Sequence, residues 1–109
     1  MKKIIQKKLY DTEISKEILK ISNKLEITNI SYFEETLYKT ESGKYFIYWK
    51  WWPQSKFWIK EGNITFAWSD IWLVNKEDIL FWVEYNFKYF SQENIEIILA
   101  ELKQEISIW

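Results

Sequence analysis

The 109-residue sequence contains no cysteine, no histidine and no arginine. Without cysteine there is no disulfide framework, no thiolate nucleophile and no thiolate metal ligand. Without histidine the commonest general base and the commonest metal ligand are missing, which excludes Ser-His-Asp and Cys-His catalysis. All 15 basic residues are lysines, so bidentate guanidinium contacts with phosphate or carboxylate groups are excluded as well.

Small residues are scarce too, because the chain has only two Gly, two Ala and one Pro. The apolar fraction of 48% is ordinary for a globular domain. Its aromatic share is not ordinary, since 8 Trp, 7 Tyr and 7 Phe are present. A chain of this length with so much aromatic bulk predicts one folded domain over residues 1–109 and excludes a disordered tail.

The net charge of −1 conceals an asymmetry along the chain. Residues 1–60 carry 12 lysines and 7 acidic residues, whereas residues 61–109 carry 3 lysines and 9 acidic residues. The longest apolar run, Ile79–Val83, is far too short to span a membrane. The N-terminal lysines are not followed by the apolar segment of a signal peptide. We therefore expect a soluble, cytoplasmic protein that does not enter a membrane.

The sequence predicts an α+β fold with an N-terminal helix, a small antiparallel sheet of about four strands and two C-terminal helices. A short extended segment opens the chain, and isoleucines at helical spacing then predict a helix over Glu13–Asn23, capped by Asp11-Thr12. Alternating patterns predict strands over Phe33–Thr40, Tyr45–Trp52, Phe57–Ile59 and Ile64–Trp68, with a turn at Gly43, a break at Ser69-Asp70 and a short extended piece over Ile71–Val74. Asn75 and Ser91 are expected to cap two helices, the second of which reaches the C-terminus.

The aromatic residues exceed what one core requires. Side chains alternate across a strand, so the segment from Tyr45 to Trp52 places apolar residues on both faces of the sheet. The helix after Asn75 likewise carries a second aromatic stripe beside its core stripe. We expect a core of Phe33, Phe46, Phe66, Phe87 and Trp109. The surplus defines the candidate contact residues: Tyr48, Lys50, Trp51, Trp52, Lys56 and Trp58, and more weakly Trp82, Tyr85 and Tyr89.

Such a surface fits three kinds of partner. Exposed Trp and Tyr dominate the hot spots of protein interfaces. Aromatic rings with lysines between them also suit stacking on single-stranded bases, and tryptophan-rich strands suit sugar rings. Glu34 and Glu35 are adjacent in a predicted strand and therefore point to opposite faces, so they do not form a catalytic carboxylate pair. We expect a binding protein and not an enzyme, with no cofactor and no metal.

The order of several short motifs resembles a known family. Tyr10-Asp11-Thr12-Glu13 is followed by Glu34-Glu35-Thr36-Leu37-Tyr38-Lys39-Thr40, by Gly43-Lys44-Tyr45-Phe46, by Ser55-Lys56-Phe57, by Asp70-Ile71-Trp72-Leu73 and by Trp82-Val83-Glu84. This order, over roughly residues 1–90, is similar to that of small proteins carried by phages and other mobile elements, some of which are grouped with anti-CRISPR proteins. Members usually carry glycines where this chain has Trp51 and Trp52.

The resemblance implies a small intracellular protein that acts by binding, and no catalytic residue comes with it. An anti-CRISPR protein would bind a Cas effector and block it sterically. Two alternatives remain, namely a toxin-immunity protein or antitoxin with one protein partner, and a single-stranded nucleic-acid-binding module, which we favour less. A homodimer also remains open. We expect the acidic residues of the C-terminal half to form a solvated helix face; they are Glu84, Glu93, Glu96, Glu101 and Glu105. The alternative is that they contact a basic nucleic-acid channel.

Overall fold

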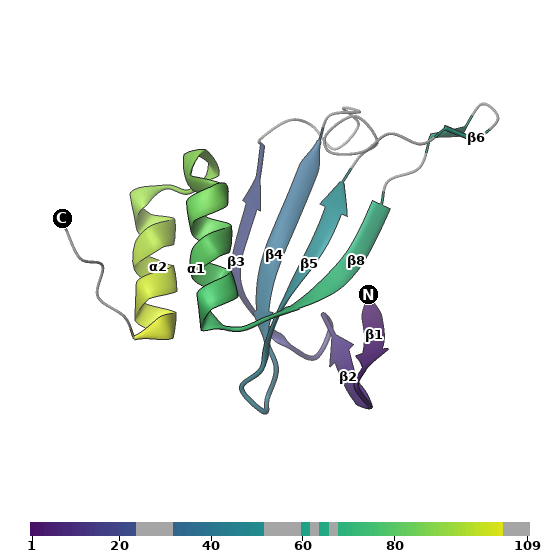
Figure 1. The fold of residues 1–109 in the computed structure, drawn as a ribbon, viewed down its shortest axis with the longest axis horizontal. Coiled ribbons are helices and arrows are strands. Elements are labelled where there is room, and N and C mark those ends of the chain that lie inside the picture. The colour runs from purple at the N-terminus through teal and green to yellow at the C-terminus, as the bar shows by residue number, and fades with distance from the viewer. Residues whose placement is uncertain (24–31, 52–59, 62–63, 66–67, 104–109) are drawn as a thin grey trace.

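A computed structural model describes residues 1–23, 32–51, 60–61, 64–65 and 68–103 (Figure 1). The strands are β1 (Lys2–Ile5), β2 (Lys8–Asp11), β3 (Lys16–Ser22), β4 (Phe33–Lys39), β5 (Tyr45–Trp51), β6 (Lys60–Glu61), β7 (Ile64–Thr65) and β8 (Trp68–Val74). The helices are α1 (Lys76–Tyr85), the short 3-10 helix η1 (Phe87–Tyr89) and α2 (Gln92–Leu102). The predicted α+β class is confirmed.

A four-stranded antiparallel sheet with the order β3-β4-β5-β8 organises the fold. β4 and β5 form the predicted hairpin, in which Leu37 lies opposite Ile47 and Gly43 takes the positive φ of 88° that the turn requires. β5 pairs in turn with β8, so that Ile47 lies opposite Trp72. The β1–β2 and β6–β7 pairs are separate two-stranded hairpins.

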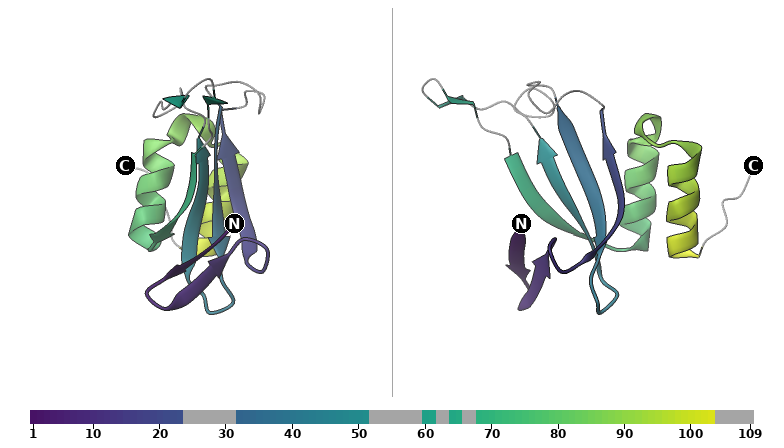
Figure 2. Two further views of the ribbon diagram at one scale, coloured as in Figure 1. Left: turned by 90° about the vertical axis from the view of Figure 1, so that its right-hand side faces the viewer. Right: turned by 180° about the vertical axis from the view of Figure 1, so that it is seen from behind.

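The two faces of the sheet are covered by different elements (Figure 2). Ile47 belongs to a core cluster that also contains Ile79 of α1 and Ile98 of α2. The preceding residue, Phe46, points to the opposite face and packs with Tyr10 of β2. Helices therefore cover one face, and the N-terminal hairpin covers part of the other.

Both C-terminal helices begin as the sequence predicts. The side chain of Asn75 accepts a hydrogen bond from the Asp78 N–H, and the Asp78 carboxylate accepts one from the Asn75 N–H. Ser91 and Asn94 form the same reciprocal arrangement at the start of α2. Each capping box satisfies backbone donors that would otherwise lack partners.

The predicted N-terminal helix over Glu13–Asn23 is wrong, because Lys16–Ser22 forms strand β3 at the edge of the sheet. The register between β3 and β4 shifts between Glu17 and Leu19, as it does at a β-bulge. Ile18 packs against the same core cluster as the buried Leu19 and Ile21. Because of the bulge, Ile18 and Ile21 contact the same core although they are three residues apart, a spacing that is typical of a helix.

Three smaller expectations also need correction. Ser69 and Asp70 do not break the extended segment, because β8 runs through them and pairs with β5. The last helix ends at Leu102, where Lys103 takes a left-handed conformation with φ 54°. Phe33 and Phe46 are buried as expected, but Phe87 is 59% exposed. Phe66, Trp109 and the predicted strand Phe57–Ile59 lie outside the described residues.

Candidate functional site

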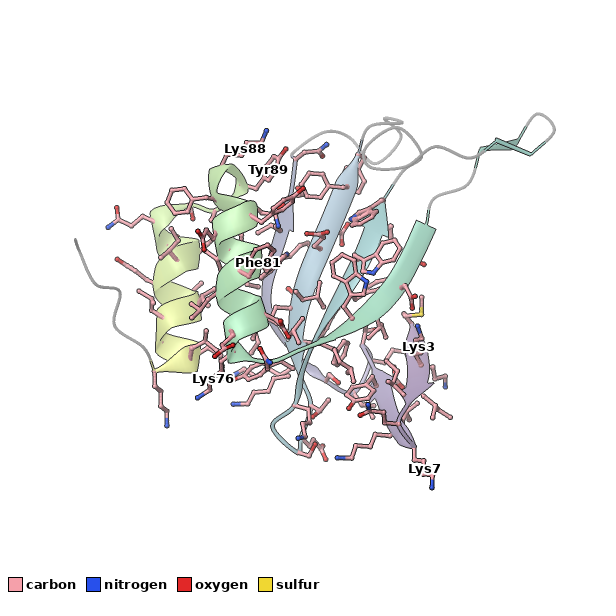
Figure 3. The ribbon with its side chains drawn as sticks, viewed as in Figure 1. Lys3, Lys7, Lys76, Phe81, Lys88 and Tyr89 are labelled. Atoms are coloured by element: carbon pink, nitrogen blue, oxygen red, sulfur yellow. The ribbon has the colours of Figure 1, made fainter. Side chains whose placement is uncertain are left out.

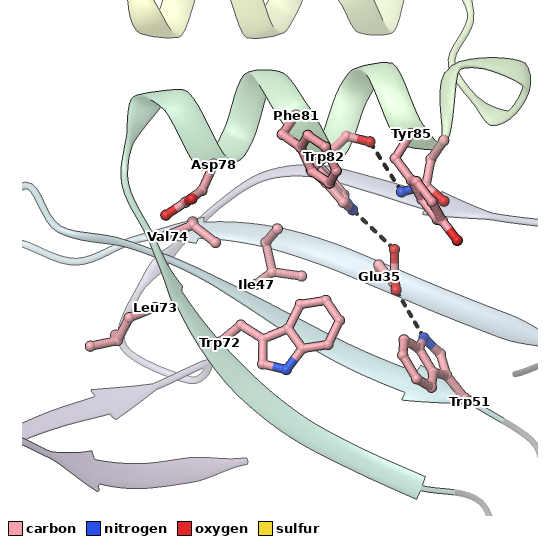
Figure 4. A pocket seen from close by; sticks show the side chains of 11 residues that line it. Glu35, Ile47, Trp51, Trp72, Leu73, Val74, Asp78, Phe81, Trp82 and Tyr85 are labelled. Atoms are coloured by element: carbon pink, nitrogen blue, oxygen red, sulfur yellow. Dashed lines mark hydrogen bonds between the residues drawn. The ribbon is translucent and has the colours of Figure 1, made fainter. Parts of the chain in front are cut away.

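An apolar groove lies in the wedge between β8 and α1 (Figure 4). The two elements are joined by the single residue Asn75, so they separate progressively from that point. The groove has a volume of about 490 Å³, within the range of roughly 300–1,000 Å³ of small-ligand sites. Its lining comprises Glu35, Ile47, Trp51, Trp72, Leu73, Val74, Asp78, Phe81, Trp82, Tyr85 and Asn86.

A buried carboxylate lies in this lining. Glu35 is 2% exposed, and each of its oxygens accepts a hydrogen bond from an indole N–H. Trp82 Nε1 donates to Oε1 at 3.0 Å and Trp51 Nε1 donates to Oε2 at 2.9 Å. Two tryptophans, one from the helix and one from the sheet, thus fix the orientation of one acid.

The alternation of β4 explains why this acid is buried. Phe33, Glu35 and Leu37 share the face of the sheet that the helices cover, and both apolar neighbours are buried in the core. Glu34 points to the opposite face, as predicted, and forms an ion pair with Lys20 at 3.1 Å. Glu34 is therefore half-buried and ion-paired, whereas Glu35 is enclosed by tryptophans.

Three tryptophans pack together beside Glu35, on the β5–β8 side of the groove. The ring centroid of Trp49 lies 4.4 Å from that of Trp51 and 5.6 Å from that of Trp72. Trp49 is buried, and its indole N–H has no hydrogen-bond partner in the part of the chain that the structure describes. Trp72 is 41% exposed, so one large ring of this cluster reaches the surface.

The helical wall of the groove presents two further aromatic rings. Phe81 and Tyr85 lie one helical turn apart and stack with ring centroids 6.1 Å apart. They are 66% and 71% exposed, respectively, and Figure 3 shows Phe81 projecting from α1. Between them on the helix, Trp82 turns inward and packs edge-on against Phe90. The groove therefore has an exposed aromatic rim and a buried polar base.

The structure separates the predicted contact residues into different places. Trp51, Trp82 and Tyr85 line the groove, but Trp82 is 5% exposed and belongs to the core, whereas Tyr85 is 71% exposed. Tyr89 is half-buried and packs edge-on against Phe33, outside the groove lining. Lys88 lies over the Tyr89 ring, and Figure 3 places both at one end of α1.

Tyr48 and Lys50 lie on the opposite face of the sheet. Tyr48 is half-buried and packs against the cluster that contains Phe46, while Lys50 is half-buried near the end of β5. The other residues of the expected surface, Trp52, Lys56 and Trp58, lie outside the described residues.

A polar network occupies the same opposite face. Burial opposes ionisation of Glu34, but hydrogen bonds from Tyr32 and Lys20 outweigh it and lower the pKa of the Glu34 carboxyl. Burial and the hydrogen bond to Glu34 together raise the pKa of Tyr32 to about 12. These interactions connect Lys20 of β3 with Glu34 of β4.

The acidic residues of the C-terminal half are of two kinds, exposed and hydrogen-bonded to the sheet. Glu84, Glu93 and Glu96 are exposed, in agreement with a solvated helix face. Glu101 instead accepts hydrogen bonds from Lys39 at 2.9 Å and from Tyr45 at 2.7 Å, and therefore ties α2 to the sheet.

Sequence reasoning missed the three residues that define the groove most clearly, Glu35, Trp72 and Phe81. Glu35 could have been recognised from the sequence, because it is a charged residue that shares one strand face with the apolar Phe33 and Leu37. Trp72 lies in a segment that was expected only as a short extended piece, and Phe81 falls outside both predicted helix stripes.

Comparisons with protein-family models, with curated proteins and with solved structures returned no match. Within the described residues, no group of acidic side chains is arranged to hold a metal ion. No described helix combines the length and apolar character needed to cross a membrane.

Proposed function

We propose that this protein acts by binding another protein, and that the groove between β8 and α1 is its contact surface. The observation that carries the proposal is the exposed aromatic rim of Trp72, Phe81 and Tyr85 beside a groove of about 490 Å³. Large exposed rings on rigid elements are typical of interface hot spots, because they bury much area with little loss of rotamer freedom.

The resemblance in motif order suggests the class of partner. On that basis the protein is encoded by a mobile element and is an anti-CRISPR inhibitor that blocks a Cas effector sterically. The absence of histidine and cysteine from the chain supports action by occupancy over action by catalysis. A toxin-immunity protein would use the same surface on a different partner.

The test combines an interference assay with direct binding. The protein is expressed in cells that carry a CRISPR system of defined type and a matching target plasmid, and plasmid survival is measured for each effector type. The effector that is inhibited is then purified, and its affinity for the protein is measured by calorimetry. Full interference by every effector type, with no binding to any purified effector, overturns the anti-CRISPR assignment.

Variants connect the activity to the groove. The double substitution Phe81→Ala and Tyr85→Ala removes two exposed rings and introduces strong helix formers, so α1 should stay folded. The matched control is Phe87→Ala, which removes an exposed aromatic ring outside the groove lining. We expect the double variant to lose inhibition and effector binding and the control to keep both. Equal loss in both proteins contradicts the groove as the contact surface.

A further inference from the structure

The charged residues among the described lining of the groove are all acidic. They are Glu35 and Asp78, and no lysine is among these described lining residues. The ion pairs of the described residues use other acids, namely Asp70, Glu34 and Glu101. In a chain with nearly equal numbers of lysines and acidic residues, the groove is therefore both aromatic and acidic.

Within the described part of the chain, the hydrogen-bond partners of Glu35 are two neutral indole groups. Both of its oxygens accept hydrogen bonds from indole N–H groups. None of the ion pairs among the described residues includes it, although it is 2% exposed. A buried carboxylate without a counter-charge is unfavourable, and an incoming cation would relieve that cost.

We infer that the groove binds a basic side chain, lysine or arginine, of the partner protein; this inference rests on the proposed function. The alkyl stem would lie on Ile47 and Val74. The cationic head would lie among the faces of the aromatic rings on the Glu35 side, and Asp78 would add negative charge from the other end of the groove (Figure 4).

Charge complementarity favours this occupant over the two other kinds of anchor. An apolar side chain would leave Glu35, which is already buried, without a compensating charge. An acidic side chain would be repelled by both carboxylates of the lining. A cation gains from the rings and from the acids at once, and this combination is the usual recognition site for organic cations.

The test uses two small probes that share a four-carbon stem. Nα-acetyl-lysine methylamide carries the ammonium group, and Nα-acetyl-norleucine methylamide lacks it. Each is titrated into the ¹⁵N-labelled protein, and the indole N–H signals of Trp51, Trp72 and Trp82 are followed by NMR. We expect the lysine probe to bind about tenfold more tightly than the norleucine probe, and added salt to reduce that ratio.

Substitutions test whether the preference for the lysine probe arises in the groove. Glu35→Gln should equalise the two probes, because it removes the charge and keeps the side-chain length. If that variant does not fold, Trp72→Leu provides the second measurement, since it removes an exposed ring and should reduce the ratio. Phe87→Leu is the matched control outside the groove and should leave the ratio unchanged.

Several outcomes overturn the inference. They are equal binding of the two probes to the wild-type protein, no shift of the indole signals with either probe, and tighter binding of tetramethylammonium than of the lysine probe, which would indicate a small free cation. A lysine preference without inhibition of any effector contradicts the anti-CRISPR proposal alone. Inhibition that depends on Phe81 and Tyr85 without a lysine preference contradicts this inference alone.

Discussion

Trp82 and Glu35 are 47 residues apart in the sequence, and the indole N–H of the first donates to the carboxylate of the second at 3.0 Å. This contact fixes α1 against the central strand β4. Because Trp82 also packs edge-on against Phe90, the residue that follows η1, it connects α1 both to this segment and to the sheet at the base of the groove. The site and the core are therefore built from the same side chain.

The first prediction concerns the two donors to Glu35. Trp82→Phe leaves one buried oxygen without its donor and creates a small cavity, so it should lower the free energy of unfolding by about 3 kcal/mol. Trp51→Phe removes the other donor from a half-buried position that water can reach, so the loss should be about 1 kcal/mol. Urea unfolding followed by circular dichroism measures both. A larger loss for Trp51→Phe would contradict the proposed difference in burial.

The second prediction is a pH dependence that arises from Glu101. Burial opposes its ionisation, but hydrogen bonds from Lys39 and Tyr45 outweigh this and lower the pKa of the carboxyl below its ordinary value of 4.5. A carboxyl with a lowered pKa in the folded state stabilises the protein above pH 4.5 and loses that contribution as the pH falls through the folded-state pKa.

The Glu101→Gln variant should therefore be less stable at neutral pH by about 1 kcal/mol. The difference from the wild-type protein should shrink as the pH falls from 4.5 through the lowered folded-state pKa of Glu101. Thermal unfolding between pH 2.5 and pH 7 measures both curves. Glu96→Gln is the control, since Glu96 is exposed on the same helix. Parallel curves for the Glu101 variant and the wild type would show that the ion pair adds nothing.

The third prediction concerns the turn between β1 and β2. Gln6 and Lys7 both have positive φ, at 53° and 66°, as a two-residue hairpin turn of type I′ requires. Residues with a side chain are disfavoured there, so Lys7→Gly should stabilise the protein by about 1 kcal/mol. The control, Lys8→Gly, places glycine in the strand and should destabilise it. Thermal unfolding distinguishes the two, and an equal effect of both variants contradicts the turn geometry.

The sequence was a good guide where local chemistry decides the structure. Capping residues at Asn75 and Ser91 predicted both helix starts, and Gly43 predicted the turn between β4 and β5. Alternation also predicted correctly that Phe46 and Ile47 face different layers. Each of these features depends on interactions within a few residues of the chain.

The sequence was a poor guide where an element distant along the chain determines the local structure. The bulge in β3 is defined by pairing with β4, and it makes Ile18 and Ile21 contact the same core at a spacing that is typical of a helix. Glu35 could be placed on a strand face, but its enclosure depends on Trp82 of α1. The groove arises from the angle between β8 and α1, which no local pattern encodes.

The last prediction concerns the exposed edge of the sheet. Among the described residues β8 pairs with β5 alone, so it is an edge strand, and such strands tend to pair with other chains. The Ile71 N–H donates to the Asp70 carboxylate at 2.8 Å, and Lys3 of β1 forms an ion pair with the same carboxylate at 2.7 Å. Asp70 thus accepts a hydrogen bond from a backbone N–H of the edge strand and places a charge beside that strand. Charged side chains at the edge are one way in which natural sheets resist pairing with other chains.

Asp70→Ala should therefore increase self-association of the protein, with the dimer constant tightened on the order of tenfold, or about 1.4 kcal/mol. The hydrogen bond from Lys3 is the main cause that lowers the pKa of Asp70 below 3.8. The wild-type protein should therefore keep this protection at pH 4 and lose it only in stronger acid, as Asp70 becomes protonated. Sedimentation velocity over a range of concentrations measures both effects. Ser69→Ala, in the same strand, is the control, and equal association of the two variants would show that Asp70 does not protect the edge.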